Sequence, residues 1–169
     1  MRKNKKRNHQ KHPVPNHKYK DRLFRLVFNN KRDLLDLYNA LNNTCYENPN
    51  DLEVNTLEDA VYLSMKNDIS FLIGGTLNLY EHQSTYNPNM PLRGLIYLAR
   101  LYDGYVETKN INLYSSSLKK LPIPQYFVFY NGTKEQPDET ILQLTDAFES
   151  VSDNRQPCLQ CTAVMLNIN

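Results

Sequence analysis

Hydrophobic residues recur along this chain at two spacings, about 3.6 residues in some segments and about two residues in others. The helical spacing occurs in residues 21–28, 31–41 and 91–106. The alternating strand pattern occurs in residues 52–57, and short, largely apolar runs predict further strands in residues 68–73, 77–83, 125–130 and 140–144. Residues 60–65 fit either a further strand or a short helix, and residues 42–51 and 107–120 are predicted to be turns and loops. Strands mixed with helices predict a single α/β domain in which helices flank a mixed sheet.

The segment around Gly74 and Gly75 predicts a β-hairpin. A Gly-Gly pair between two apolar runs of strand length is typical of a two-residue turn. With these glycines as the turn, Asp68 lies directly opposite Glu81 on the neighbouring strand. A three-residue loop would instead shift the pairing by one residue and place Asp68 opposite His82.

The predicted hairpin brings two carboxylates together. Directly opposed side chains have Cβ atoms about 4.5–5.5 Å apart, and like charges at that position destabilise a sheet. A divalent cation held by Asp68 and Glu81 would remove the repulsion, and Mg²⁺ prefers such oxygen ligands. Gln83 shares the Glu81 face, while His82 points away. The alternative interpretation is that Asp68 caps the start of a strand and Glu81 ends a strand in solvent.

The acids and their surroundings resemble a nuclease motif. Asp68 after Asn67, followed by Glu81-x-Gln83 at the end of the next strand, is similar to the PD-(D/E)XK signature, with Gln83 where most members have Lys. Residues 80–84 (Tyr-Glu-His-Gln-Ser) and 87–93 (Asn-Pro-Asn-Met-Pro-Leu-Arg) resemble the Rpn family of recombination-promoting nucleases, which belongs to that superfamily. Residues 19–24 and 124–132 add further matches, so the resemblance covers roughly residues 17–169.

This resemblance implies a restriction-endonuclease-like fold over residues 18–169 and a metal-dependent DNA endonuclease linked to recombination or transposition. The implied cofactor is Mg²⁺, with Mn²⁺ as a substitute, held by Asp68, Glu81 and the backbone carbonyl of His82. The family's first helix often supplies another acid beside the metal, which corresponds to Asp21. A simpler interpretation is that Asp21 interacts favourably with the helix dipole.

Positive charge near the acids has several candidate sources. Arg93, Tyr97 and Arg100 share one face of the predicted helix over residues 91–106, and the planar fork of arginine suits phosphate. The alternatives are a solvated face, or Arg93 paired internally with Glu81. In the predicted register, Lys66 lies opposite Gln83 and could supply the charge that a neutral glutamine lacks.

The same helix has a neighbouring apolar face. We expect this face to pack on the sheet through the residues Leu92, Leu95, Ile96 and Ala99.

The charge of the chain is unevenly distributed. Residues 1–20 contain eight Lys or Arg and no acid, so the remaining 12 basic residues accompany all 18 acids in residues 21–169. Residues 1–17 are therefore predicted to be a disordered basic tail. Such a tail can bind a nucleic-acid backbone with steep salt dependence, or it can serve as a solubilising counterweight to an acidic body.

Other features narrow the class of protein. Three cysteines do not suggest a disulfide framework and fit a reducing cytoplasm. A zinc site would need more ligands than Cys158, Cys161 and Cys45 offer. No window approaches the ~18–20 apolar residues of a membrane span, and the basic start lacks the apolar core of a secretory signal.

Two departures from the family leave other functions open. Family members usually extend beyond the apolar run that ends at Asn169, so we expect this chain to be shortened at its C-terminus relative to them. The acidic body is also a poor DNA surface by itself. The alternatives are a non-catalytic DNA- or partner-binding remnant of a mobile-element protein, or an inhibitor or assembly partner of a longer relative. A homodimer is compatible with either.

Overall fold

The computed structural model of the chain describes residues 28, 30–55, 68–149 and 156–169. The strands are β1 (Glu53–Val54), β2 (Ile69–Ile73), β3 (Thr76–Gln83), β4 (Ile123–Tyr130), β5 (Glu139–Gln143) and β6 (Thr162–Asn167). The helices are α2 (Lys31–Asn42), α3 (Met90–Thr108) and the short 3-10 helices η1 (Pro49–Asp51) and η2 (Leu144–Ala147). The predicted α/β class with a mixed sheet in a single domain is confirmed.

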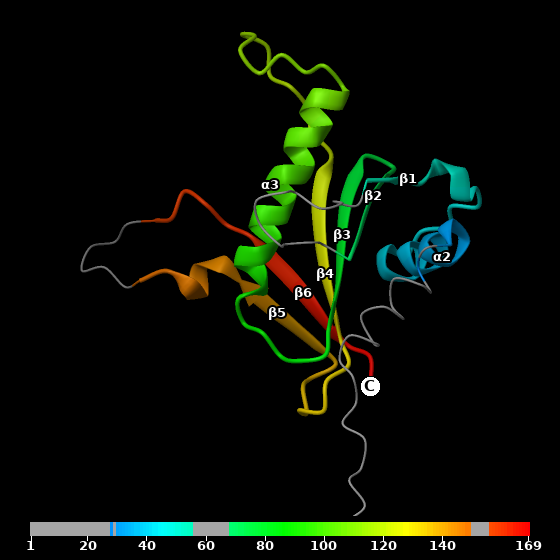
Figure 1. Ribbon diagram of the computed structural model, residues 1–169, viewed down its shortest axis with the longest axis vertical. Coiled ribbons are helices and arrows are strands. Elements are labelled where there is room, and N and C mark those ends of the chain that lie inside the picture. Colours follow the sequence, from blue (N-terminus) through cyan, green and yellow to red (C-terminus); the bar gives the residue numbers. More distant parts are fainter. Residues whose placement is uncertain (1–27, 29, 56–67, 150–155) are drawn as a thin grey trace, which may run out of the picture.

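All six strands form one sheet in the order β1-β2-β3-β4-β6-β5. The pairs β3–β4 and β4–β6 are parallel, and the other neighbours are antiparallel. Parallel neighbours cannot be joined by a tight turn and need a crossover connection. The α3 helix lies within the crossover from β3 to β4 and crosses one face of the sheet (Figure 1).

Each face of the sheet carries its own hydrophobic core. Under α3, the alternating residues of β3, β4 and β6 pack against the helix, and Leu79, Val128 and Ala163 are fully buried. On the opposite face, α2 packs against the β2–β3 hairpin. Tyr80 is fully buried there, and its ring makes edge contacts with the rings of Phe71, Phe127 and Phe129.

Local signals fix the ends of α2. The side chain of Asn30 accepts a hydrogen bond from the backbone N–H of Arg32, which satisfies one free donor at the helix start. Asn43 adopts the left-handed conformation after the last turn and ends the helix. The predicted helix over residues 31–41 is thus confirmed with one more residue at its end.

The predicted turn of the hairpin is also confirmed. Gly74 and Gly75 have φ values of 55° and 80°, and Ile73 pairs with Thr76. Glycine adopts such positive φ values without the steric cost that other residues meet, which explains the Gly-Gly pair. The two-residue turn fixes the register, and every later pairing along β2 and β3 follows from it.

The packing face of α3 differs from the predicted one. Leu92 and Ala99 are exposed and Ile96 is only half-buried, whereas Leu95 is half-buried but packs against the core under α3 as predicted. The helix instead packs through a stripe of residues at helical spacing, namely Met90, Gly94, Tyr97, Leu98 and Leu101. A Cβ atom at Gly94 would overlap the ring of Tyr126 on β4, so this glycine lets the helix approach the sheet closely. Compared with the predicted orientation, α3 is rotated about its own axis, so that the face with Arg93 and Tyr97 is turned towards the sheet.

Two other strand predictions need correction or extension. Only Glu53–Val54 of the predicted strand over residues 52–57 is a strand, and residues 56 and 57 lie outside the described part of the chain. The strand β6 was not predicted, although it lies between β4 and β5 in the sheet. The predictions for residues 60–65, and nearly all of those for residues 1–28, also fall on residues that the structure does not describe.

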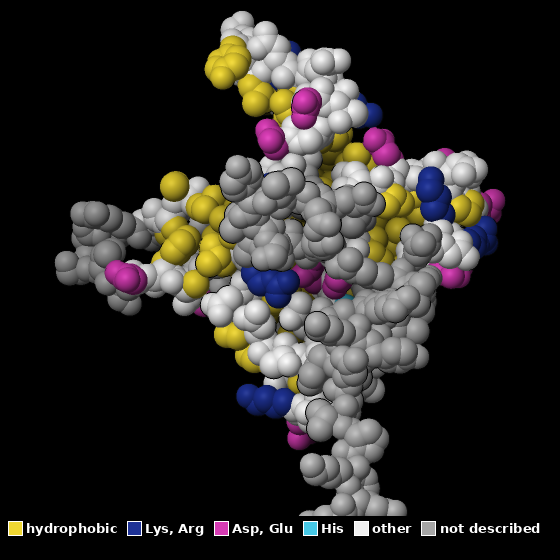
Figure 2. All heavy atoms as spheres, in the orientation of Figure 1, with side chains coloured by type: hydrophobic (Ala, Val, Ile, Leu, Met, Phe, Trp, Pro, Cys, Tyr) yellow, Lys and Arg dark blue, Asp and Glu magenta, His cyan; other side chains and the backbone are white. Residues whose placement is uncertain are grey.

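The surface of the described residues is mixed in character. Figure 2 shows hydrophobic side chains over the end of the molecule that contains β5, where Ile141, Phe148 and Leu159 are exposed.

All three cysteines are free thiols, and burial raises the pKa of the Cys161 thiol. Among the described residues, none of the helices has the length and apolar composition needed to cross a bilayer.

Candidate active site

The predicted pairing of Asp68 with Glu81 is present at the open end of the hairpin. Asp68 directly precedes β2, and its backbone N–H donates to Glu81 Oε1 at 3.1 Å. In return, the backbone N–H of His82 donates to Asp68 Oδ2 at 2.7 Å. The last backbone pair of the hairpin joins Ile69 to Tyr80, and the two carboxylates extend the hydrogen-bonded ladder beyond it. Each acid is fixed by a backbone donor of the opposite segment.

Glu81 is buried, unlike the solvent-exposed strand end of the alternative interpretation. Its side chain is only 2% exposed, and it lies on the α3 face of the sheet next to Val128 of β4. A buried carboxylate needs hydrogen bonds and an opposite charge to remain ionised. Arg93 provides that charge, because its Nη2 atom lies 3.1 Å from Glu81 Oε2. The alternative in which Arg93 pairs internally with Glu81 is therefore confirmed.

Arg93 has further contacts along its own helix. Its Nη2 atom also donates to the hydroxyl of Tyr97 at 3.3 Å, and its Nη1 atom lies 3.5 Å from the sulfur of Met90. Burial by itself lowers the pKa of the guanidinium, but the hydrogen bond to Tyr97 and the charge of Glu81 outweigh it and raise the pKa overall. Arg93 therefore stays charged at this site.

Tyr126 of β4 is buried under α3 next to Gly94 and was not singled out by the sequence. Its hydroxyl is buried and has no hydrogen-bond partner within the described residues. Burial raises its pKa well above the ordinary value, and the charge of Glu81 adds to that shift. Tyr126 thus lies close enough to Glu81 for the charge of the carboxylate to act on it. Only the parallel register between β3 and β4 brings it there, and no local pattern in the sequence encodes that register.

The carboxylate and carbonyl oxygens at this site are the kind of ligand that Mg²⁺ prefers. Successive backbone carbonyls along β3 point alternately to its two neighbouring strands. Those of Gly75 and Gln83 accept hydrogen bonds from Ile123 and Asn131 on the β4 side. The carbonyl of His82, one residue before Gln83, therefore points towards β2. Asp68, Glu81 and this carbonyl could then share one cation. The described residues contain no group of three or more His, Cys, Asp or Glu side chains placed to hold a metal. Magnesium commonly binds through only one or two carboxylates, with waters and substrate phosphate completing its shell.

The side chains of Gln83 and His82 point to opposite faces, as the alternation predicts. Gln83 is half-buried on the Glu81 face, opposite Tyr130 of β4. His82 is 4% exposed on the α2 side. Gln83 therefore has the placement needed to act beside the acids, and only the backbone of His82 can do so.

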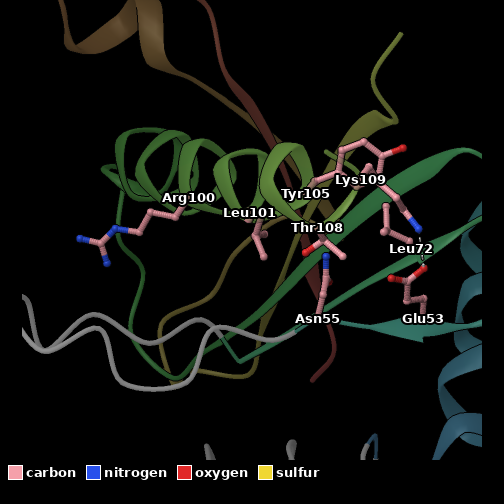
Figure 3. Close-up of a pocket in the computed structure, with 9 residues that line it drawn as sticks. Glu53, Asn55, Leu72, Arg100, Leu101, Tyr105, Thr108 and Lys109 are labelled. Carbon is pink, nitrogen blue, oxygen red and sulfur yellow. Dashed lines mark ion pairs between the residues drawn. The ribbon is translucent and has the colours of Figure 1, made fainter. Parts of the chain in front are cut away.

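Arg100 lies two turns further along α3 and lines a separate hollow of about 160 Å³. The hollow lies between the second half of α3 and the β1–β2 edge, and its other charged lining residues are Glu53 and Lys109. Figure 3 shows the guanidinium of Arg100 extending away from Asn55 and Lys109. Its Nη1 atom is buried without a hydrogen-bond partner in the described part of the chain. The residues that line this hollow with Arg100 do not include Asp68, Glu81 or Arg93.

Two predicted site residues, Asp21 and Lys66, lie outside the described residues. Their proximity to the acids is therefore still a prediction. The space-filling view shows basic side chains beside acidic ones near the centre of the molecule (Figure 2).

Comparison with known proteins gives no relatives for this chain: no family model, curated protein or solved structure matches it.

Proposed function

We propose that this chain is a metal-dependent DNA endonuclease that hydrolyses phosphodiester bonds in recombination or transposition. The observation that carries the proposal is the pairing of Asp68 with Glu81 beside the guanidinium of Arg93. Two acids on adjoining segments can hold a divalent cation, and an arginine next to them can hold a phosphate. The mixed sheet, with an antiparallel hairpin followed by a helix and a parallel strand, is compatible with a restriction-endonuclease-like fold.

In the proposed reaction, Asp68, Glu81 and the carbonyl of His82 would hold Mg²⁺, or Mn²⁺ in its place. Such a cation, when bound, polarises a phosphoryl oxygen and lowers the pKa of the attacking water. Arg93 binds the non-bridging phosphate oxygens through its planar fork. Gln83 orients the water or the phosphate by hydrogen bonds, since its amide offers both donors and an acceptor.

Further residues belong to this proposal on the basis of the sequence predictions. Lys66 would supply the positive charge that Gln83 lacks, and Asp21 would add an acid beside the metal. Arg100 would contact the DNA backbone away from the point of cleavage. The basic residues 1–20 would add salt-dependent affinity for DNA, and the cytoplasm is the compartment that we propose.

Cleavage of a supercoiled plasmid by the purified chain tests this function. With Mg²⁺ or Mn²⁺ we expect nicked and linear products, and with EDTA we expect none, because the two acids cannot activate water without a cation. Conversion of the plasmid is followed on agarose gels over time.

The alternative function is a non-catalytic DNA- or partner-binding protein, including a homodimer or a complex with a longer relative. The pairing of Arg93 with Glu81 favours it, because a carboxylate that is already neutralised attracts a cation less strongly. This alternative predicts DNA binding that is lost at high salt and no cleavage with either cation. A folded chain that binds DNA but never cuts it would contradict the endonuclease.

A further inference from the structure

Glu81 faces an electrostatic conflict if it serves as a metal ligand. Its carboxylate is 2% exposed, and both of its oxygens already accept hydrogen bonds, Oε1 from Asp68 N–H and Oε2 from Arg93. A cation approaching Oε2 meets the guanidinium at the same oxygen. Two positive groups a few ångströms apart repel one another, and the repulsion is stronger in a buried site than in water. The metal and Arg93 therefore compete for Glu81.

The contact between Arg93 and Glu81 is weaker than this pair of residues can make. Arginine and a carboxylate often form two parallel hydrogen bonds, which is their strongest arrangement. Here Nη2 alone contacts Glu81, while Nη1 lies 3.5 Å from the sulfur of Met90, a weak acceptor. Some N–H donors of the guanidinium therefore lack a strong acceptor, and the oxygens of a phosphate would accept hydrogen bonds from them.

Arg93 is also the partner with access to solvent. Its side chain is 29% exposed, whereas that of Glu81 is 2% exposed, so the arginine is the partner that faces solvent. It lies in the first turn of α3 at the edge of the site. Tyr97, one turn further on, hydrogen-bonds the same Nη2 atom and would limit how far the guanidinium moves.

The charge balance of the site favours an exchange. Asp68, Glu81 and Arg93 together carry one net negative charge when all three are ionised. With a divalent cation the total becomes one positive charge, which matches the single negative charge of a phosphodiester. The site would thus be neutral only with both cation and substrate in place.

On this basis, and on the premise that the proposed function is correct, we propose that Arg93 is the resident counter-ion of Glu81 and is exchanged for the metal. In the free protein Arg93 neutralises the buried carboxylate. When the two acids bind a divalent cation, Arg93 moves from Glu81 to the phosphate of the substrate. The same side chain therefore weakens metal binding in the free protein and strengthens phosphate binding in the complex.

The affinity for Mn²⁺ in the absence of DNA tests this exchange. It is measured by electron paramagnetic resonance of free Mn²⁺ at pH 8 on folded wild-type protein, Arg93→Gln and Arg93→Lys. We expect Arg93→Gln to bind Mn²⁺ about tenfold more tightly than the wild type, a fold-change that corresponds to about 1.4 kcal/mol. Arg93→Lys keeps the charge and should remain close to the wild type. Plasmid cleavage by Arg93→Gln should fall although its metal affinity rises.

Two control variants separate this exchange from a general effect of charge. Lys109→Gln removes one positive charge at the far end of the same helix and should leave the affinity for Mn²⁺ unchanged. In a Glu81→Gln background, Arg93→Gln should give no gain, because the competition acts through Glu81. Equal affinities of wild type, Arg93→Gln and Lys109→Gln would overturn the exchange and leave the metal site standing. No binding that depends on Asp68 and Glu81 in any variant would overturn the proposed function and the exchange together.

Discussion

Glu81→Gln is expected to abolish metal-dependent cleavage of DNA while leaving the chain folded. Glutamine keeps the shape of the side chain, and its one amide oxygen can still accept the hydrogen bond from Asp68 N–H, while Arg93 loses its acceptor and turns to solvent. The charge that attracts a cation is lost. A bound metal is worth several kcal/mol of transition-state stabilisation, and about 1.4 kcal/mol is a factor of ten in rate, so we expect a loss of at least about 100-fold. Asp68→Asn should have an effect of similar size. Initial rates of plasmid nicking at saturating Mg²⁺ measure both.

Glu139→Gln is the matched control for this loss. Glu139 is exposed on the edge strand β5 and lies far along the sheet from β2 and β3, so its substitution makes the same change in net charge away from the site. Its cleavage rate should equal that of the wild type. Cleavage by Glu81→Gln at the wild-type rate would remove Glu81 from the mechanism, and an equal loss in Glu139→Gln would indicate a general effect of charge.

Tyr80→Ala is expected to cause the largest loss of stability. The ring of Tyr80 is fully buried at the centre of the aromatic cluster under α2. Truncating a large buried aromatic side chain to alanine typically lowers the free energy of unfolding by about 3–5 kcal/mol, through lost contacts and the cavity left behind. Since small domains are stable by only about 5–15 kcal/mol, this variant should unfold at much lower urea concentration. Urea denaturation followed by circular dichroism measures the change.

Tyr80→Phe provides the matched comparison at the same position. The hydroxyl of Tyr80 is buried without a hydrogen-bond partner among the described residues, and burial, with the neighbouring Tyr38, raises its pKa far above the ordinary value. Removing an unsatisfied buried hydroxyl is nearly neutral or stabilising, so we expect a change within about 1 kcal/mol. A loss in Tyr80→Phe as large as that in Tyr80→Ala would mean that the hydroxyl, and not the ring packing, stabilises this cluster.

The central feature of the site could be predicted because its signals are local. Gly74 and Gly75 determine a two-residue turn, and the alternation of the flanking strands then determines which side chains share a face. Asp68 and Glu81 are placed together by that turn alone. The direction of the Gln83 and His82 side chains follows from the same register.

The rest of the site depends on contacts between distant segments. Arg93 turns towards Glu81 because α3 packs through Gly94 and Tyr97, and the apolar residues of α3 surround the helix so widely that the sequence does not single out this face. Tyr126 reaches the site only through the parallel pairing of β3 with β4 across a long crossover. The strand β6 was missed because its place between β4 and β5 is decided by the sheet and not by neighbouring residues.

Paramagnetic broadening by Mn²⁺ in the amide spectrum of ¹⁵N-labelled chain tests the central claim most directly, because it locates the cation without requiring turnover. Substoichiometric Mn²⁺ should first broaden the backbone signals of Asp68, Glu81 and His82, and the same titration of Glu81→Gln should leave these signals sharp. Broadening that is confined to exposed acids elsewhere, or that persists unchanged in Glu81→Gln, would contradict a metal site formed by Asp68 and Glu81.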